Sequence, residues 1–387
     1  MEDGGIEPDD VLPAAEKSRI RETGSADPPV EVSTRSSQDD PMSLRLISNR
    51  LLPIVALVAT LPFSVMTSDA FAAAPQVRKQ APGFYRMMLG NFEITALLDG
   101  THPFPSNVLT KPDASSDLPE HPRKELLELD PEELETLLGE VDLSSPVEGA
   151  INAFLVNTGR KLILIDSGAG ILYGVYGGHL LGNLAASGYS PDQIDEVYLT
   201  HLHADHVGGM LHDGKMSFPN ATVRVRQEDY DYWLDRSKQA AAPALLKTMF
   251  DGAISSLQPY LDLGRVKPYE GSVELSPGIR SIPAPGHTPG HSFYEVTSGT
   301  STMVMWGDIV HMAPVQFPDP SVTVAYDSDG DSAEKQREGI FAEAAAKGYW
   351  IGAAHVSFPG IGHVGSYGGT FRWIPANYTT VLPAPTE

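Results

Sequence analysis

The stretch Leu199-Thr-His-Leu-His-Ala-Asp-His-Val-Gly-Gly209 places three histidines and one aspartate within six consecutive positions. His201 and His203 are two residues apart, so on a segment that leaves a strand they point the same way and can hold one cation. Asp205 and His206 follow on the turn, toward a second cation. Imidazole and carboxylate ligands suit Zn, Mn, Fe or Co. Because the chain has no cysteine, thiolate sites such as structural zinc fingers are excluded.

Four further polar residues stand in or after apolar, strand-like runs. A buried sheet presents the ends of its strands at one edge, so residues placed there can converge. We therefore expect these four side chains to meet the histidine-rich stretch. They are Asp166 after Lys161–Ile165, His287 within Pro285–His291, Asp308 after Met303–Gly307, and His355 after Trp350–Ala354.

The order of these motifs resembles the metallo-β-lactamase superfamily: His-x-His-x-Asp-His, then Gly-His-Thr-Pro-Gly-His, then Gly-Asp, then a late histidine. The resemblance covers roughly residues 85 to 380. Within the superfamily, the chain is most similar to the methyl parathion hydrolases, which are secreted dinuclear phosphotriesterases, and to their relatives that cleave lactones and aryl esters. The segments that carry this closer resemblance are Ala74–Arg78, Gly90–Gly100, Leu155–Gly159, Val315–Phe317 and His355–His363.

The resemblance implies a site for two divalent metal ions, with Zn the expected metal, and every ligand position is filled in this chain. Asp166 would accept a hydrogen bond from a ligand histidine and would not itself bind metal. The implied ligands are His201, His203 and His287 for one ion, Asp205, His206 and His355 for the other, and Asp308 between them.

The remaining histidines lack this ligand spacing. We expect His291 to be structural, packed behind the loop that carries His287. The others are expected at the surface or in hydrogen bonds. They are His102, His121, His179, His212, His311 and His363.

The expected chemistry is hydrolysis, with Asp308 and Asp205 as the catalytic carboxylates. A water held between two cations loses a proton near neutral pH and becomes a nucleophile. The sequence lacks the Gly-x-Ser-x-Gly elbow of serine esterases. Organophosphate triesters, aryl esters and lactones are the expected substrates. A glyoxalase II-like thioesterase is the alternative, although we find no clear cluster of basic residues that would bind the carboxylates of glutathione. A non-catalytic binding protein is the third hypothesis.

Three aromatic residues are candidates for the substrate pocket. By the resemblance, Tyr173, Trp233 and Phe250 would line a hydrophobic pocket for an aromatic leaving group. The competing interpretation is that they belong to the core, where most aromatic side chains of helices lie. Tyr173 stands where the methyl parathion hydrolases have phenylalanine, which would add a hydroxyl to the pocket wall.

The chain divides into three parts. Residues 1–41 are rich in acidic residues, Pro and Ser, and we expect them to be disordered. Residues 42–72 have the basic start, short apolar run and Ala-x-Ala ending of a signal peptide, so translation is expected to begin at Met42 and the protein to be periplasmic or secreted. A retained membrane anchor is the alternative. Residues 73–387 form the hydrolase domain.

Charge and family resemblance indicate the partners. The formal net charge of −23 opposes nucleic acid, whose phosphates would be repelled. We expect a small-molecule ester, lactone or phosphotriester as the ligand and no stable membrane association after cleavage. Dimeric relatives imply a homodimer.

The expected fold is an α/β, αβ/βα sandwich, in which two mixed sheets face each other and helices flank them. Apolar runs predict the strands and amphipathic runs predict the helices. The expected strands are 92–98, 153–157, 162–166, 196–200, 222–226, 293–296 and 302–306, and the expected helices are 181–187 and 331–347.

Overall fold

The computed structural model describes residues 74, 76–104, 106–112, 126–139 and 143–383. The expected extension 1–41 and signal peptide 42–72 lie outside the described residues. Contacts group residues 81–387 into one unit, and the description below concerns that unit. None of its described helices is both long and apolar enough to cross a membrane.

The first large sheet carries the stretch that contains the histidine motif. Its strand order is β1-β2-β5-β6-β7-β10-β11, with β6, β7, β10 and β11 parallel and the remaining pairs antiparallel. All four residues of β6 are buried, since layers cover both faces of the sheet. The strands are β1 (Phe84–Leu89), β2 (Phe92–Phe104), β5 (Val147–Asn157), β6 (Leu162–Ile165), β7 (Glu196–Tyr198), β10 (Thr222–Arg226) and β11 (Val266–Tyr269).

The second large sheet has the order β12-β13-β14-β15-β17-β18-β19. Only the pair β15 and β17 is parallel within it. The strands are β12 (Val273–Ser276), β13 (Ile279–Pro283), β14 (Ser292–Ser298), β15 (Ser301–Met305), β17 (Trp350–Gly352), β18 (Ile361–Tyr367) and β19 (Thr370–Pro375).

The two sheets pack against each other through a shared apolar core. Phe154 and Val156 of β5 belong to the same buried cluster as Val296 of β14 and Met303 of β15. Their neighbour Leu155 points to the opposite face of the first sheet, as the alternation of a strand requires. The core therefore has a central layer between the sheets and an outer layer on each side.

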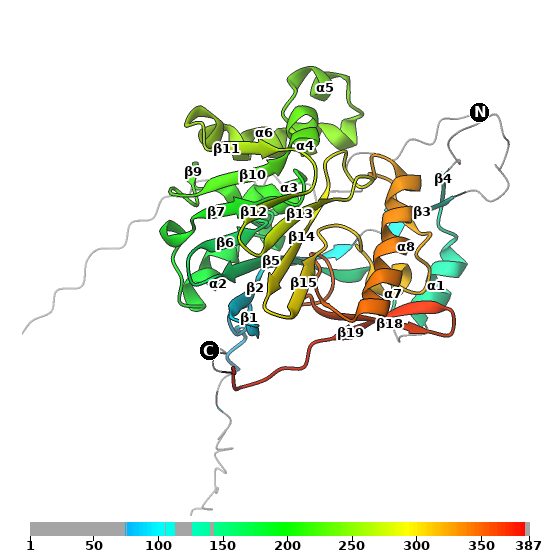
Figure 1. Cartoon of the computed structure of the whole chain (residues 1–387). Helices are drawn as coiled ribbons and strands as arrows, with labels where there is room; N and C mark the ends of the chain where they lie inside the picture. The colour runs from blue at the N-terminus through cyan, green and yellow to red at the C-terminus, as the bar shows by residue number, and fades with distance from the viewer. Residues whose placement is uncertain (1–73, 75, 105, 113–125, 140–142, 384–387) are drawn as a thin grey trace, which may run out of the picture. The chain divides into compact units, whose positions relative to one another are not determined.

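Helices cover the outer faces (Figure 1). On the first sheet, α2 (Leu180–Ala186) and α6 (Ala244–Asp262) contribute Leu184 and Phe250 to the outer cluster. On the second, α8 (Gly330–Lys347) contributes Phe341. The Asp329 side chain caps the start of α8 by accepting a hydrogen bond from the Ser332 amide. The predicted αβ/βα sandwich is confirmed.

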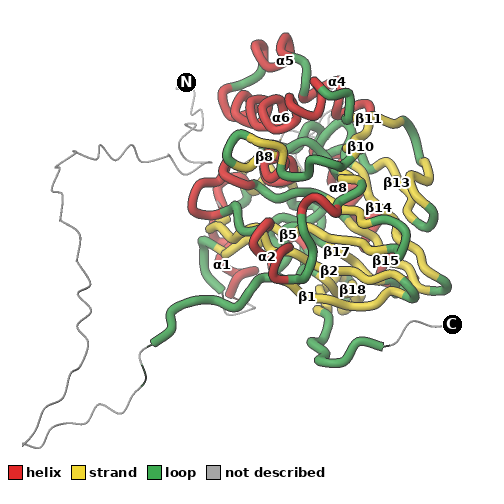
Figure 2. The backbone as a smooth tube through the Cα atoms, turned by 90° about the vertical axis from the view of Figure 1, so that its left-hand side faces the viewer, coloured by secondary structure: helices red, strands yellow, loops and turns green. Residues whose placement is uncertain are grey.

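Smaller elements complete the unit. In Figure 2, α4, α5 and α6 gather at one end of the unit beside β10 and β11. The others are α1 (Pro131–Gly139), α3 (Ala204–Val207), α4 (Gln227–Trp233), α5 (Arg236–Ala241) and α7 (Ala313–Gln316), with η2 (Ser106–Val108), η4 (Gly170–Tyr176), η5 (Pro191–Gln193) and η6 (Gly208–Met210), and the short strands β3 (Leu109–Pro112), β4 (Leu126–Glu128), β8 (Leu211–His212), β9 (Lys215–Met216) and β16 (Thr323–Val324).

The predicted elements agree with the structure to within a few residues, apart from the longer β2 and β5. Prediction and structure coincide for 222–226, which is β10, while the predicted strands 162–166 and 196–200 end earlier, at Ile165 and Tyr198. The shorter ends leave Asp166 and Thr200 outside the ladders. Their side chains meet at the site, where the Thr200 hydroxyl donates a hydrogen bond to the Asp166 carboxylate.

Candidate metal centre

Strand ends deliver the predicted site residues to one place. Asp166 follows β6, His201 comes shortly after β7, Asp308 comes after β15 and His355 after β17, while His287 lies on the loop between β13 and β14. Both sheets therefore contribute. Asp205 and His206 are carried by α3, a single turn that begins directly after His203.

The seven residues that the resemblance implies as ligands come together in two groups. Within each group, one potential ligand atom per residue lies within 4.8 Å of all the others. Asp308 belongs to both groups, as expected of a shared carboxylate. The first group is His201, His203 and His287 with Asp308, and the second group is Asp205, His206 and His355 with Asp308.

The two oxygens of Asp308 face different groups. Oδ1 lies 2.9 Å from His206 Nε2 and 3.1 Å from His355 Nε2. Oδ2 lies 3.2 Å from His287 Nε2 and 3.5 Å from His201 Nε2. His355 Nε2 is also 3.2 Å from Oδ2. The carboxylate thus stands between the two groups with one oxygen directed mainly to each.

The ring nitrogens that face away from the site make hydrogen bonds that orient the histidines. His206 Nδ1 is 2.9 Å from Asp166 Oδ2, and His355 Nδ1 donates to the Ala150 carbonyl oxygen at 2.9 Å. His201 Nδ1 lies 3.1 Å from the Thr200 hydroxyl. Such bonds fix the tautomer and the ring plane and leave Nε2 directed into the site.

As the sequence predicts, Asp166 lies beside a ligand candidate, His206. Its backbone adopts a left-handed φ of 60°, which is uncommon outside glycine. Its carboxylate also accepts hydrogen bonds from the Thr200 amide and hydroxyl, both at 2.8 Å. These bonds hold the turn after β6 against the start of the histidine motif.

Electrostatics in the polypeptide itself favour a cation at this place. Burial lowers the pKa of His201 and His203 well below the ordinary value, and neighbouring imidazoles lower it further. Burial opposes a charge on His206 too, but the carboxylates of Asp308, Asp205 and Asp166 raise its pKa well above the ordinary value. Against burial, the surrounding histidines hold the pKa of Asp308 well below its usual range. The buried carboxylate of Asp308 thus favours positive charge on the surrounding imidazoles. Against burial, which opposes both shifts, this carboxylate raises the pKa of His287 to about 9 and the pKa of His355 above its ordinary value.

The residues fit two divalent cations. His201 Nε2, His206 Nε2 and Asp308 Oδ1 are buried and make no hydrogen bond among the described residues. Unsatisfied buried polar atoms are costly, and here they converge on common points. His203 Nδ1 and His287 Nε2 also face each other at 2.9 Å. Imidazole with carboxylate is a donor set that Zn and similar metals accept.

Two further buried residues contact the centre and were not predicted as part of it. His311 Nε2 lies 3.1 Å from Asp308 Oδ2, and burial lowers the pKa of this histidine to about 4. Asp327 Oδ1 lies 2.6 Å from His287 Nδ1. The signal for His311 is its position three residues after Asp308. Asp327 has no comparable signal, because it reaches His287 from forty residues away along the chain.

His291 has the structural role that the sequence predicted. Its Nδ1 donates to the Ala284 carbonyl oxygen at 3.1 Å, and its Nε2 accepts from the Asp308 amide at 3.0 Å. Burial lowers its pKa to about 3, which keeps Nε2 an acceptor. Gly307 permits this contact, since a Cβ there would lie 2.6 Å from His291 Nε2 and the residue has a φ of +54°.

The remaining predicted histidines are distributed as follows. His102 is half-buried, with its ring centroid 5.6 Å from that of Tyr173, and His363 Nδ1 donates to the Tyr349 carbonyl oxygen. His179 and His212 are exposed. His121 lies outside the described residues.

The three pocket candidates lie in two environments. Tyr173 is half-buried, and burial together with Asp205 and Asp308 raises its pKa well above the ordinary value. Trp233 and Phe250 are 1% and 0% exposed and pack on each other in the outer core of the first sheet. The Trp233 ring also meets the His203 ring edge-on, with centroids 4.8 Å apart. Whether Trp233 and Phe250 contact substrate stays a prediction.

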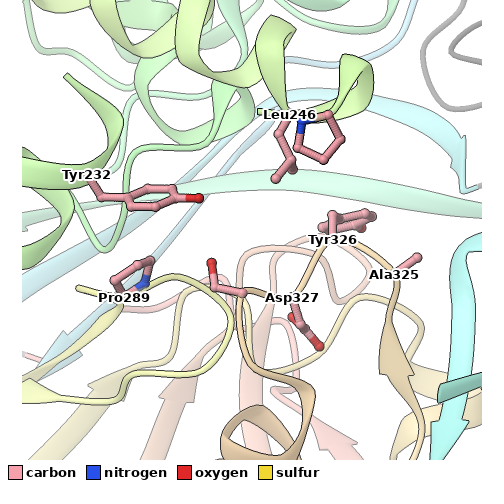
Figure 3. A pocket seen from close by; sticks show the side chains of 8 residues that line it. Tyr232, Leu246, Pro289, Ala325, Tyr326 and Asp327 are labelled. Atoms are coloured by element: carbon pink, nitrogen blue, oxygen red, sulfur yellow. The ribbon is translucent and has the colours of Figure 1, made fainter. Parts of the chain in front are cut away.

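A cavity of about 370 Å³ lies beside the first group. Tyr326 connects the two, since its ring contacts the rings of His203, His287 and His311. Figure 3 shows the Tyr232 hydroxyl directed into this space, across from Pro289. The lining residues are Tyr232, Pro243, Leu246, Pro289, Ala325, Tyr326, Asp327 and Ser328.

A second cavity, of about 400 Å³ and more apolar, lies beside the start of α3. Ala204, which precedes Asp205, forms part of its wall together with Tyr173. The remaining lining residues are Leu172, Thr248, Met249, Asp251, Gly252 and Ser255. Two cavities that could hold an organic ligand are therefore lined by residues next to the centre in the fold or in the sequence.

Comparison with known families identifies the superfamily to which the fold belongs. Residues 146–355, which hold all seven proposed ligands, match the model of the metallo-beta-lactamase superfamily. The chain belongs to this superfamily. Closeness to methyl parathion hydrolases within the superfamily stays a prediction.

Among solved structures of the superfamily, the chain is similar to the hydrolase AbOPH, with 38% identity, 78% of this chain and 100% of that chain covered, and a TM-score of 0.69. It is also similar to AidC, a dizinc quorum-quenching lactonase solved with the product N-hexanoyl-L-homoserine, with 27% identity, coverage of 77% and 99%, and a TM-score of 0.64. An N-acyl homoserine lactonase of Bacillus thuringiensis is 29% identical over 118 residues, which are 30% of this chain and 39% of the relative. The chain thus spans about two fifths of the length of that curated relative.

Proposed function

We propose that this chain is a dinuclear metal-dependent hydrolase of small lactones and esters. The arrangement of Asp308, with its two oxygens directed to two separate groups of histidines, carries the proposal. In this proposal His201, His203 and His287 hold one divalent ion, Asp205, His206 and His355 hold the other, and Asp308 binds both. Zn is the proposed metal, since the similar lactonase AidC is dizinc.

The bound metals would supply a nucleophile from water at neutral pH and an electrophile for the substrate oxygen. The polypeptide would contribute orientation and protons. Burial and the carboxylates of Asp205 and Asp308 raise the pKa of Tyr173, and the same causes act on Tyr326, so both hydroxyls stay protonated at neutral pH. A protonated hydroxyl can donate a hydrogen bond to a departing alkoxide, which an alkyl lactone releases, whereas an aryl ester or an aryl lactone such as dihydrocoumarin releases a phenolate.

Support for a lactone or ester as substrate comes from two sources. Lactonases are among the similar proteins, one of them as a structure with its product bound. The two cavities, of about 370 and 400 Å³, have the size range of small-molecule sites. Organophosphate triesters and aryl esters are proposed as further substrates, on the resemblance to methyl parathion hydrolases.

The deciding experiment compares kcat/KM for dihydrocoumarin and methyl parathion, with metal content measured on the same sample of the full chain. We expect two metal ions per chain and a preference for the lactone. Preference for methyl parathion would shift the native chemistry to phosphotriesters. Failure to hydrolyse any lactone, ester, thioester or phosphotriester with both metals bound would favour a binding protein, and thioester preference would favour the glyoxalase II-like alternative.

We also propose that the protein is exported to the periplasm or secreted, after cleavage of residues 42–72, and that it forms a homodimer. The residue pattern of the signal and the resemblance to exported, dimeric relatives support this. N-terminal sequencing should find Ala73 or a neighbour as the first residue of the exported protein. Light scattering should give twice the chain mass, and a monomer would contradict the second part.

A further inference from the structure

Helix α4 places a buried carboxylate between the loops of the first group. Asp229 is fully buried, and its two oxygens accept three hydrogen bonds. Oδ2 accepts from the Leu202 amide and from the Thr288 hydroxyl, each at 3.0 Å, and Oδ1 accepts from the Gly290 amide at 2.6 Å. Among the described residues Asp229 forms no ion pair, so these three donors provide the main stabilisation of its carboxylate charge.

The three donors stand beside the proposed ligands of the first group. Leu202 lies between His201 and His203, and Thr288 directly follows His287. The first of these loops leaves the first sheet after β7, and the second connects β13 and β14 of the second sheet. A single side chain therefore joins the two loops that supply all three histidines of the first group.

Packing around Asp229 supports a fixed position for it. At Gly290, a Cβ would lie 2.4 Å from the Asp229 amide nitrogen, so the loop approaches the helix as closely as glycine permits. Trp233 lies four residues further on the same helix face and packs edge-on against the His203 ring. Helix α4 thus contacts both the backbone and a ring of the first group.

We propose that Asp229 is a positioning residue for the first metal, holding the His201–His203 loop and the His287 loop at the separation that one cation requires. This inference rests on the proposed function, because it presupposes that the first group binds metal. Asp229 itself contacts neither metal nor substrate in the proposal. Its effect passes through Leu202, Thr288 and Gly290.

Asparagine at position 229 is a sharp test because it keeps the shape of the side chain. Burial raises the pKa of Asp229 to about 6, although the bonds from Thr288, Gly290 and Leu202 oppose the rise, so the carboxylate is ionised at neutral pH. In Asp229→Asn an amide NH2 group replaces one oxygen, and this group donates hydrogen bonds but cannot accept them. Either the Gly290 amide or the Leu202 and Thr288 donors then lose their buried acceptor.

The experiment is a titration of the metal-free full chain with Zn²⁺ in competition with a chromophoric chelator, which yields both dissociation constants. For Asp229→Asn we expect one of the two constants to weaken about tenfold or more, the order seen when a residue behind a metal ligand is changed. The other constant should stay within about twofold. In the double variant Asp229→Asn/Asp166→Asn both constants should weaken, since Asp166 supports His206 of the second group.

Asp231→Asn is the matched control, because Asp231 lies on the same helix but is exposed and accepts a bond from Gln227. It should leave both constants unchanged. If Asp229→Asn does not fold, Thr288→Val removes one of the three bonds without touching the carboxylate, and a weakened single constant would support the proposal. Unchanged constants, or equal weakening of both, in Asp229→Asn or, if that variant does not fold, in Thr288→Val would overturn it. A wild-type chain that binds no Zn²⁺ would instead refute the proposed function.

Discussion

The first and second groups receive their support from different parts of the fold. The histidines of the first group depend on side chains from outside the strand ends, because Asp229 joins their loops and Asp327 contacts His287. The second group depends on the turn after β6, where Asp166 contacts His206 and both the amide and the hydroxyl of Ser167 donate to the His206 carbonyl oxygen. If the two groups hold metals that share Asp308, as proposed, we expect the binding of each metal to be weakened separately.

Substitution of Asp308 should produce the largest effect, because both groups share this carboxylate and its loss affects both of them. We expect Asp308→Ala to lower the affinity for both metals and to reduce kcat/KM for a lactone by about a thousandfold or more, because several kcal/mol of charge stabilisation disappear. Metal analysis and kinetics on the same sample measure both effects. Asp262→Ala, at the exposed end of α6, is the control. An active variant with two metals would remove Asp308 from the proposed ligands.

A pair of conservative variants should separate the two groups. Asp327→Asn removes the anion that faces His287 Nδ1 at 2.6 Å, and Asp166→Asn removes the anion that faces His206 Nδ1 at 2.9 Å. Each is expected to weaken one metal about ten- to a hundredfold, the first variant in the first group and the second variant in the second group. Zn²⁺ titration of each single variant and of the double variant measures this. Single variants that weaken both constants equally would show that the groups behave as one unit.

Strand ends explain why so much of the site could be predicted. The apolar run 162–165 could only be a buried strand or a short buried helix, and the polar residue at its end marks a sheet edge. The same pattern before Asp308 and His355 led to the correct convergence. The proposed ligand set was implied by the resemblance of these motifs, in their order along the chain, to the metallo-β-lactamase superfamily, so no long-range contact had to be known.

Residues that act across loops could not be predicted in this way. Asp229 and Asp327 lie in the segments Gln227–Trp233 and Tyr326–Asp329, which contain several carboxylates and aromatic rings that no spacing rule distinguishes. Their roles depend on which loop packs against them, which is decided by the arrangement of the two sheets. Helix α6 was also not delimited, because Gly252 and Pro259 interrupt its pattern with residues that disfavour a helix interior.

The smallest expected effect is on the pH dependence of the free energy of unfolding. It arises from the titration of Asp229, which supports the first group. Burial raises the pKa of Asp229 to about 6 in the folded chain, above its ordinary value in an unfolded one. Between these two values the folded state binds more protons, so stability falls as pH rises. From pH 5 to 7.5 this amounts to about 1 kcal/mol.

Asp229→Asn lacks this titration. The wild-type chain should therefore lose about 1 kcal/mol of unfolding free energy relative to Asp229→Asn over that range, in urea unfolding of the metal-free proteins. The histidines of the centre titrate in both proteins, so their contributions largely cancel in the difference. His287 is the charged neighbour most able to disturb this cancellation, since its positive charge lowers the pKa of Asp229. A constant difference between the proteins would mean that Asp229 keeps an ordinary pKa, and its three hydrogen bonds would then outweigh its burial.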